Sequence, residues 1–153
     1  MTEEFLETIA DKFIFKVKKG ILYSREDCWV EVKNGRVTVG VTDFLQRLGG
    51  DAVFVETRAP GAVIKQAEPM GQMETIKMNM ELIAPVSGVI EEVNEILSDN
   101  PELINEDPFG QGWIYKVKGE KIEEEIKHLL TDEVYFELMK RKIAGELDRI
   151  GGK

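Results

Sequence analysis

The chain has 153 residues, the length of one ordinary domain. Its 29 aspartates and glutamates outnumber its 20 lysines and arginines and leave a formal net charge of −9, which repels phosphate backbones and anionic membranes and disfavours nucleic-acid binding. No apolar run reaches the roughly 20 residues that a membrane span needs, and residues 1–10 lack the basic and apolar regions of a secretory signal. We expect a soluble, cytoplasmic protein.

Cysteine and histidine each occur once, as Cys28 and His128. One cysteine cannot form an internal disulfide, and the pair leaves no Cys/His cluster for a metal site. His128 follows an acidic helical segment and is expected to be an ordinary surface residue rather than a catalytic base. The sequence also lacks glycine-rich phosphate-binding motifs. We therefore expect a protein that is not an enzyme, in which any reactive group is an attached one.

The first twenty residues are predicted to form a helical N-terminal extension. Apolar side chains recur at helical spacing after a candidate N-cap at Thr2, namely Phe5, Leu6, Ile9 and Phe13. The stretch from Phe13 to Lys18 fits a strand equally well, so both interpretations stay open.

Residues 21–118 are predicted to form a β-domain, because short β-branched and aromatic runs alternate with Gly, Pro and Asn. Asn34-Gly35 predicts a hairpin turn between two strands. Thr42 predicts the N-cap of a short helix that ends at Gly49-Gly50, and a strand resumes at Ala52. After a turn-rich segment over residues 98–112, a further strand is predicted over residues 113–117.

Residues 119–153 are predicted to form helices that pack on the same domain. One apolar stripe consists of Ile122, Ile126, Leu129 and Leu130. Thr131 is the candidate N-cap of a second helix, which ends at Gly151-Gly152. Its stripe consists of Val134, Tyr135, Leu138, Met139, Ile143, Leu147 and Ile150.

Two similar segments, 59–64 and 84–90, flank a central hairpin that contains Lys77. The repeat fits a quasi-symmetric β-sandwich or barrel, and a chance recurrence of Pro-Gly turns fits it equally. Lys77 lies where the hairpin would reverse, between apolar neighbours. A lysine that projects from a rigid turn has the geometry that a modifying ligase needs.

Two families of carrier domains have motifs similar to the one around Lys77. Biotinyl domains carry Ala-Met-Lys-Met, and Ile76-Lys77-Met78 shares the methionine after the lysine. Lipoyl carriers of the glycine cleavage H-protein family carry Glu-Ser-Val-Lys, which Glu74-Thr75-Ile76-Lys77 matches with conservative replacements. The hairpin alone does not separate the two families.

Sequence blocks outside the hairpin do separate them. From about Leu22 to about Arg141 the chain resembles the glycine cleavage H-protein family, in that family's order and spacing, whereas biotinyl domains lack the outer blocks. These blocks are Val39–Gln46, Gly50–Glu56, Ala84–Gly88, Glu92–Glu95 and Pro101–Gly110 followed by Gly112-Trp113.

The resemblance implies a barrel-sandwich hybrid, mainly β with flanking N- and C-terminal helices. It implies that a lipoate ligase or lipoyl synthesis enzymes attach lipoate to Lys77, within a motif that includes Glu74, Thr75, Ile76 and Met78. Such a carrier shuttles an aminomethyl intermediate and reducing equivalents between glycine decarboxylase, aminomethyltransferase and lipoamide dehydrogenase. We expect this carrier to be a monomer.

The family holds the amine of the loaded arm with polar and acidic residues, and some matching positions differ here. Cys28 stands where the family has glutamate, Phe44 stands at a His/Tyr position, and the acid four residues after the lysine is kept as Glu81. A protonated amine that leaves water needs carboxylate or hydroxyl partners, so the loss at Cys28 weakens its shelter. The arm-pocket candidates are Glu26, Asp27, Cys28, Phe44 and Glu81.

Other functions stay open. An H-like lipoate-binding protein that serves a heterodisulfide-reductase-like complex in sulfur oxidation would tolerate or use Cys28 near its arm. A single cysteine beside Trp29 is, however, more often a small buried hydrophobe than a reactive thiol. A biotinyl carrier, an unmodified interaction domain and a relay that passes lipoate to other enzymes are further alternatives.

Overall fold

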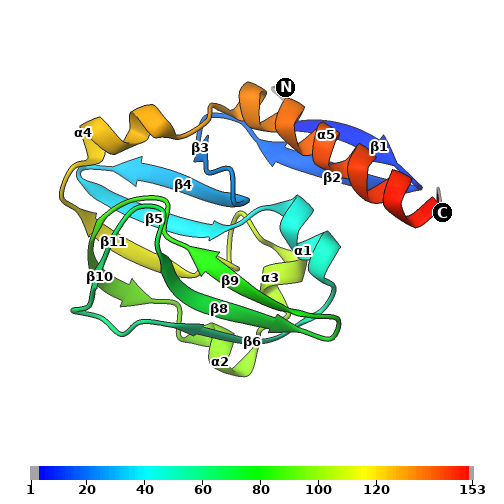
Figure 1. Cartoon of the computed structure of the whole chain (residues 1–153). Coiled ribbons are helices and arrows are strands. Elements are labelled where there is room, and N and C mark those ends of the chain that lie inside the picture. Colours follow the sequence, from blue (N-terminus) through cyan, green and yellow to red (C-terminus); the bar gives the residue numbers. More distant parts are fainter. Residues whose placement is uncertain (1–3, 152–153) are drawn as a thin grey trace.

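The computed structural model describes residues 4–151, with side chains up to residue 145. Three sheets make up its β-structure (Figure 1). A two-stranded sheet pairs β1 (Phe5–Ala10) with β2 (Phe13–Lys18). A six-stranded sheet has the order β3-β4-β5-β11-β10-β7, and a three-stranded sheet the order β6-β8-β9. The strands of these two sheets are β3 (Leu22–Tyr23), β4 (Cys28–Lys33), β5 (Arg36–Val41), β6 (Ala52–Thr57), β7 (Val63–Ile64), β8 (Pro69–Thr75), β9 (Asn79–Ile83), β10 (Gly88–Val93) and β11 (Tyr115–Gly119).

Helices are short except at the C-terminus. They are α1 (Asp43–Gly49), α2 (Ile96–Asp99), α3 (Leu103–Glu106), α4 (Ile122–Glu125), a 3₁₀ turn η1 (Ile126–His128) and α5 (Asp132–Gly151). In the described part of the chain no helix is both long and apolar enough to cross a membrane.

The main core lies between the six-stranded and three-stranded sheets. Val37, Val39 and Val41 point inward from β5, as their alternation in the sequence predicts. Met73 and Leu82 reach the same core from β8 and β9. This arrangement confirms the predicted mainly β sandwich.

The turn and cap predictions in this region are confirmed. Asn34 and Gly35 both have positive φ, 52° and 78°, as a two-residue hairpin turn between β4 and β5 requires. The Thr42 hydroxyl accepts a hydrogen bond from the Leu45 amide at 3.2 Å and so caps α1. The two similar sequence segments lie side by side, because β7 pairs antiparallel with β10.

The prediction of an N-terminal helix is wrong, because residues 5–18 form a β-hairpin, and the alternative of a strand over Phe13–Lys18 is confirmed as β2. Its two-residue tip, Asp11 and Lys12, has positive φ at both positions, 48° and 76°. Phe15 and Val17 alternate inward and are buried in a second core with α1 and α5. Tertiary contacts of these two side chains outweigh the helical spacing of the first apolar residues. The predicted N-cap Thr2 lies outside the described residues.

The C-terminal region is helical, but its first helix is shorter than its apolar stripe suggests. Leu130 leaves the helical path and forms a bridge with Tyr23 of β3. The Thr131 hydroxyl then accepts a hydrogen bond from the Val134 amide at 3.3 Å, which confirms the predicted cap of α5. Helix α5 lies across the N-terminal hairpin (Figure 1). Gly152 and the side chains of Leu147 and Ile150 lie outside what the structure describes.

Candidate functional site

Lys77 lies at the tip of the hairpin between β8 and β9. Glu74 pairs with Asn79, and the Thr75 amide donates to the Met78 carbonyl at 2.8 Å. Ile76 and Lys77 form the two-residue tip, and both are exposed. The side chain of Lys77 therefore projects from a closed turn of fixed backbone.

Thr75 fixes this tip to the end of α1. Its buried hydroxyl donates to the Gly49 carbonyl at 2.6 Å and accepts from the amides of Lys77 and Met78 at 3.2 and 3.1 Å. The Ile76 amide donates to the Asp51 carbonyl at 3.0 Å. The backbone at Lys77 is therefore held in place both by the hairpin itself and by contacts with the end of α1.

Two glycines let the end of α1 approach the hairpin. A Cβ at Gly49 would lie 2.3 Å from the Met80 Cε atom, and a Cβ at Gly50 would lie 2.9 Å from the Lys77 Cδ atom. Gly50 also has φ of 86°, a conformation that favours glycine. The methylene chain of Lys77 consequently runs over bare backbone.

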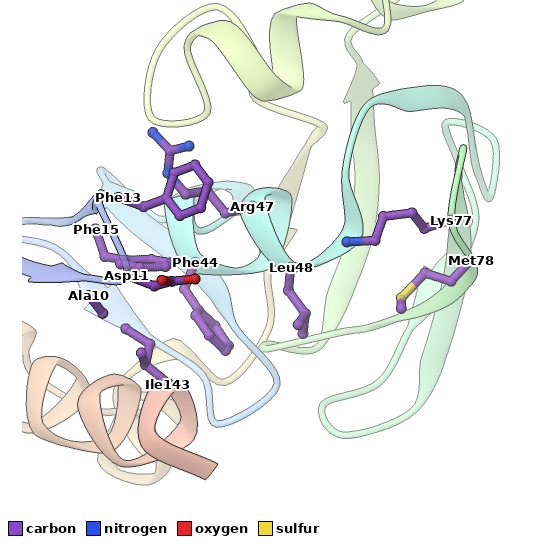
Figure 2. Close-up of a pocket in the computed structure, with 10 residues that line it drawn as sticks. All are labelled: Ala10, Asp11, Phe13, Phe15, Phe44, Arg47, Leu48, Lys77, Met78 and Ile143. Carbon is purple, nitrogen blue, oxygen red and sulfur yellow. The ribbon is translucent and has the colours of Figure 1, made fainter. Parts of the chain in front are cut away.

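A groove of about 320 Å³ begins at Lys77 (Figure 2). Its lining is mostly apolar and comes from four elements: the N-terminal hairpin, α1, the Lys77 hairpin and α5. The lining residues are Ala10, Asp11, Phe13, Phe15, Phe44, Arg47, Leu48, Lys77, Met78 and Ile143. The Lys77 side chain extends from its hairpin toward α1 and Leu48.

Three charged side chains line the groove. The Arg47 guanidinium lies over the Phe13 ring, 5.1 Å from its centroid, and donates to the Ile14 carbonyl at 3.3 Å. Asp11 lies at the hairpin tip, and Lys77 lies at the mouth. Arg47 is held by these contacts with the N-terminal hairpin. If Lys77 became an amide, Asp11 and Arg47 would be the remaining charged residues of the groove.

Phe44 is the one arm-pocket candidate that the structure brings together with Lys77. It is buried and forms part of the groove wall. Glu81 of β9 lines a separate hollow with Glu56 and Gln72. Glu26 lines another hollow with His128, which is exposed at the end of η1.

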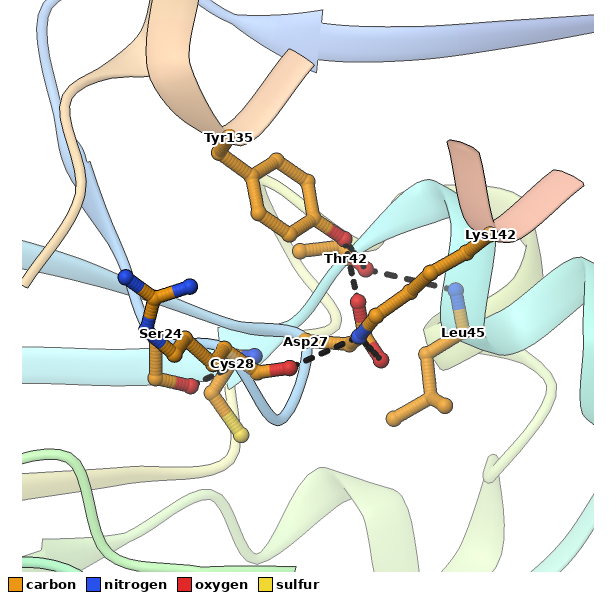
Figure 3. A network of polar contacts seen from close by, with 8 residues as sticks. Ser24, Asp27, Cys28, Thr42, Leu45, Tyr135 and Lys142 are labelled. Carbon is orange, nitrogen blue, oxygen red and sulfur yellow. Dashed lines mark hydrogen bonds and ion pairs between the residues drawn. The ribbon is translucent and has the colours of Figure 1, made fainter. Parts of the chain in front are cut away.

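Asp27 is a structural anchor for α5 (Figure 3). The Tyr135 hydroxyl donates to its carboxylate at 2.7 Å and lies 2.9 Å from the Thr42 hydroxyl oxygen. Lys142 forms an ion pair with the same carboxylate at 2.8 Å. These contacts occupy Asp27 at the junction of α5, the loop before β4 and the start of α1.

Cys28 is buried in the main core, with 3% of its surface exposed. Burial raises the pKa of its thiol to about 12, and the nearby Asp27 and Glu26 carboxylates act in the same direction. A thiol in this environment stays protonated and unreactive near neutral pH. Cys28 is outside the Lys77 groove, which favours the structural interpretation over the reactive one.

The groove contains residues that the sequence did not predict as part of the site. Ala10, Asp11, Phe13 and Phe15 reach it through the N-terminal hairpin, and Ile143 through α5. The alternation of Phe13, Phe15 and Val17 was the available signal, since it marks one face of a strand. The sequence alone does not tell which element that face covers.

A family model for the glycine cleavage H-protein matches residues 21–142. The chain belongs to the glycine cleavage H-protein family. A probable glycine cleavage system H protein of Pyrococcus abyssi is 46% identical over 127 residues, which are 82% of this chain and 94% of the relative. The glycine cleavage system H protein of a Geobacillus species is 46% identical over 122 residues, 80% of this chain and 95% of the relative.

A solved structure is similar as well. The crystal structure of a glycine cleavage system H protein from Mycobacterium marinum has a TM-score of 0.67 and 34% identity, and covers 75% of this chain and 92% of that chain. Membership of the H-protein family confirms the predicted carrier class, a lipoyl carrier rather than an enzyme. The family match begins at residue 21, after β2 has ended at Lys18. The hairpin side of the groove therefore lies outside the matched region.

Proposed function

We propose that this chain is lipoylated on Lys77 and carries aminomethyl groups and reducing equivalents between glycine decarboxylase, aminomethyltransferase and lipoamide dehydrogenase. The observation that carries the proposal is the position of Lys77, exposed at the tip of a hairpin that Thr75 ties to the Gly49 carbonyl. The relatives named above are glycine cleavage system proteins, which supports this set of partners. We also propose a cytoplasmic location and three segments of the chain: an N-terminal extension over residues 1–20, a carrier β-domain over residues 21–118, and a C-terminal region over residues 119–153.

The residues around Lys77 fit an amide-linked acyl chain. Gly50 leaves the space over which the lysine methylenes lie, and Leu48, Phe44 and Met78 provide apolar walls nearby. When attached, a lipoyl group supplies a dithiolane whose sulfurs can be reduced, acylated or alkylated. The protein's own contribution is to hold the attachment point at a fixed place and to raise the local concentration of the tethered group.

The acidic surface supports steering toward partner enzymes. Amide formation removes the Lys77 charge, so the formal charge of −9 would become −10. Complementary basic patches around partner entrances would raise the association rate more than the affinity. We expect encounters that weaken as salt is added.

Intact mass tests the attachment. Incubation with lipoate and a lipoate ligase should add one lipoyl group to the wild-type protein and none to Lys77→Arg. Lys12→Arg is a matched control, because Lys12 also occupies the second position of a two-residue hairpin tip. No mass gain in the wild type would contradict the proposal, and a biotin-sized gain would favour a biotinyl carrier.

Glycine–bicarbonate exchange tests the cargo. Lipoylated protein should support exchange with the glycine decarboxylase component, and the Lys77→Arg protein should not. Silence in a sample of verified lipoylation would favour the sulfur-carrying alternative. The sulfur-carrying alternative drew support from a Cys28 thiol near the arm. Cys28 is buried and the pKa of its thiol is raised, so that support is lost.

A further inference from the structure

The tip of the N-terminal hairpin forms one side of the groove that begins at Lys77. Ala10, Asp11, Phe13 and Phe15 line that side, and Leu48 of α1 also belongs to the lining (Figure 2). The four hairpin residues precede the family match, which begins at residue 21. Part of the groove is therefore formed by residues outside the region that the family model matches.

Hydrogen bonds fix the hairpin to α1. The Lys16 amide donates to the Asp43 carboxylate at 2.9 Å, and the Arg47 side chain donates to the Ile14 carbonyl at 3.3 Å. Asp43 is buried and also accepts from the Gln46 side chain at 2.8 Å. The hairpin is thus docked on the helix whose end supports the Lys77 turn.

The groove has the character of an acyl-chain site. The Phe15 and Phe44 rings pack at 6.2 Å between centroids, and Phe13, Leu48 and Met78 continue the apolar lining. Its volume of about 320 Å³ is at the lower end of the range for small-molecule pockets, roughly 300–1,000 Å³. That size and lining suit a single flexible hydrocarbon chain.

The charges of the groove favour a neutral occupant. Conversion of Lys77 to an amide removes a cation from the mouth, and the remaining carboxylate of Asp11 and guanidinium of Arg47 carry opposite charges. Arg47 is already stacked on Phe13. A neutral chain that starts at Lys77 therefore enters the groove without taking a charge of its own out of water.

We propose that the N-terminal hairpin is a docking wall for the lipoyl arm: the arm on Lys77 rests in this groove against Phe13 and Phe15 when no partner holds it. This inference rests on the proposed lipoylation of Lys77. A resting site of this kind shields the dithiolane from solvent until a partner enzyme competes for it.

The rate at which a water-soluble phosphine reduces the dithiolane measures this shielding. The wild-type lipoylated protein should react more slowly than free lipoamide. Phe13→Ser should speed the reaction about threefold to tenfold by weakening the resting contact. Ile14→Ser is the matched control, because Ile14 is the next residue on the same strand, is similarly exposed and does not line the groove. Equal rates for wild type, both variants and lipoamide would overturn the proposal.

A second measurement needs no variant. Lipoylation should slow hydrogen exchange of the amides at the hairpin tip, residues 10–13, relative to the unmodified protein, and should leave the distant turn at Asn34-Gly35 unchanged. Exchange at the tip that is the same with and without the arm would overturn the proposal. Intact mass checks the lipoylation first, so failure of the attachment and failure of the docking are separate results.

Discussion

The hydroxyl of Thr75 donates to the carbonyl of Gly49 across 2.6 Å, and through this bond the end of α1 holds the hairpin that presents Lys77. The same oxygen accepts from the amides of Lys77 and Met78. The buried side chain of Thr75 therefore joins the end of α1 to the turn that carries Lys77.

Thr75→Val should lower the free energy of unfolding by about 1–3 kcal/mol, because it keeps the shape but leaves buried backbone groups without their partner. It should also slow modification of Lys77, since the turn loses its tie to Gly49. Chemical denaturation and the rate of mass gain with ligase measure the two effects. Thr75→Ser keeps the hydroxyl and should retain most of both properties. Equal behaviour of the Val and Ser variants would contradict the assigned role.

Gly50→Ala should slow the modification of Lys77 beyond what backbone strain explains. Its Cβ would lie 2.9 Å from the Lys77 Cδ atom, so the lysine must leave its path along α1. Gly61→Ala is the control, because Gly61 has a similar φ of 94° and a Cβ added there would meet no atom within 4 Å. Both variants should lose more than about 1 kcal/mol of stability, and only Gly50→Ala should change the ligase rate.

Cys28 should make the fold less stable as pH rises above about 9. The pKa of its thiol is about 12 in the folded protein against 9.0 for the free group, so the unfolded chain releases its proton first. The stabilisation is complete below pH 9 and is lost as pH rises toward 12, with a slope of up to about 1.4 kcal/mol per pH unit.

Urea denaturation at pH 8, 9 and 10 measures this loss for the wild type and for Cys28→Ala. The window stops at pH 10 because the buried hydroxyls of Tyr23, Tyr115 and Tyr135 also have pKa values raised by desolvation. The Ala variant should show a smaller decrease over this range. Parallel curves for the two proteins would exclude Cys28 as the cause.

Tyr135→Phe should destabilise the protein by about 1–3 kcal/mol, because Asp27 loses a hydrogen bond in a buried position. Hydrogen exchange should increase in α5 and in the loop before β4, and much less in the central strand β5. Tyr23→Phe is a comparison for a second buried tyrosine, whose hydroxyl bonds the Lys18 carbonyl at 2.6 Å and not Asp27. Loss of protection spread evenly over the whole chain would argue against a local anchor for α5.

Local patterns predicted several elements because short-range chemistry decides them. Asn34-Gly35 supplies the positive φ values of a hairpin turn, and Thr42 supplies the oxygen that caps α1. The motif around Lys77 left two carrier families open, and the sequence blocks outside the hairpin led to the correct one. The helical spacing of Phe5, Leu6, Ile9 and Phe13 misled, because contacts of β2 with α1 and α5 decide the conformation of that segment.

The sequence by itself was enough to recognise the carrier family, through the motif around Lys77 and the blocks outside its hairpin, and to place Lys77 at a turn. Only the tertiary structure decided which side chains surround that lysine. In the fold Asp27 anchors α5 and Cys28 lies in the main core. Phe13 and Phe15, which are more than sixty residues from Lys77 in the sequence, line the groove. The reason is that pocket composition depends on how separate elements pack, and neighbouring side chains on a strand point to opposite faces.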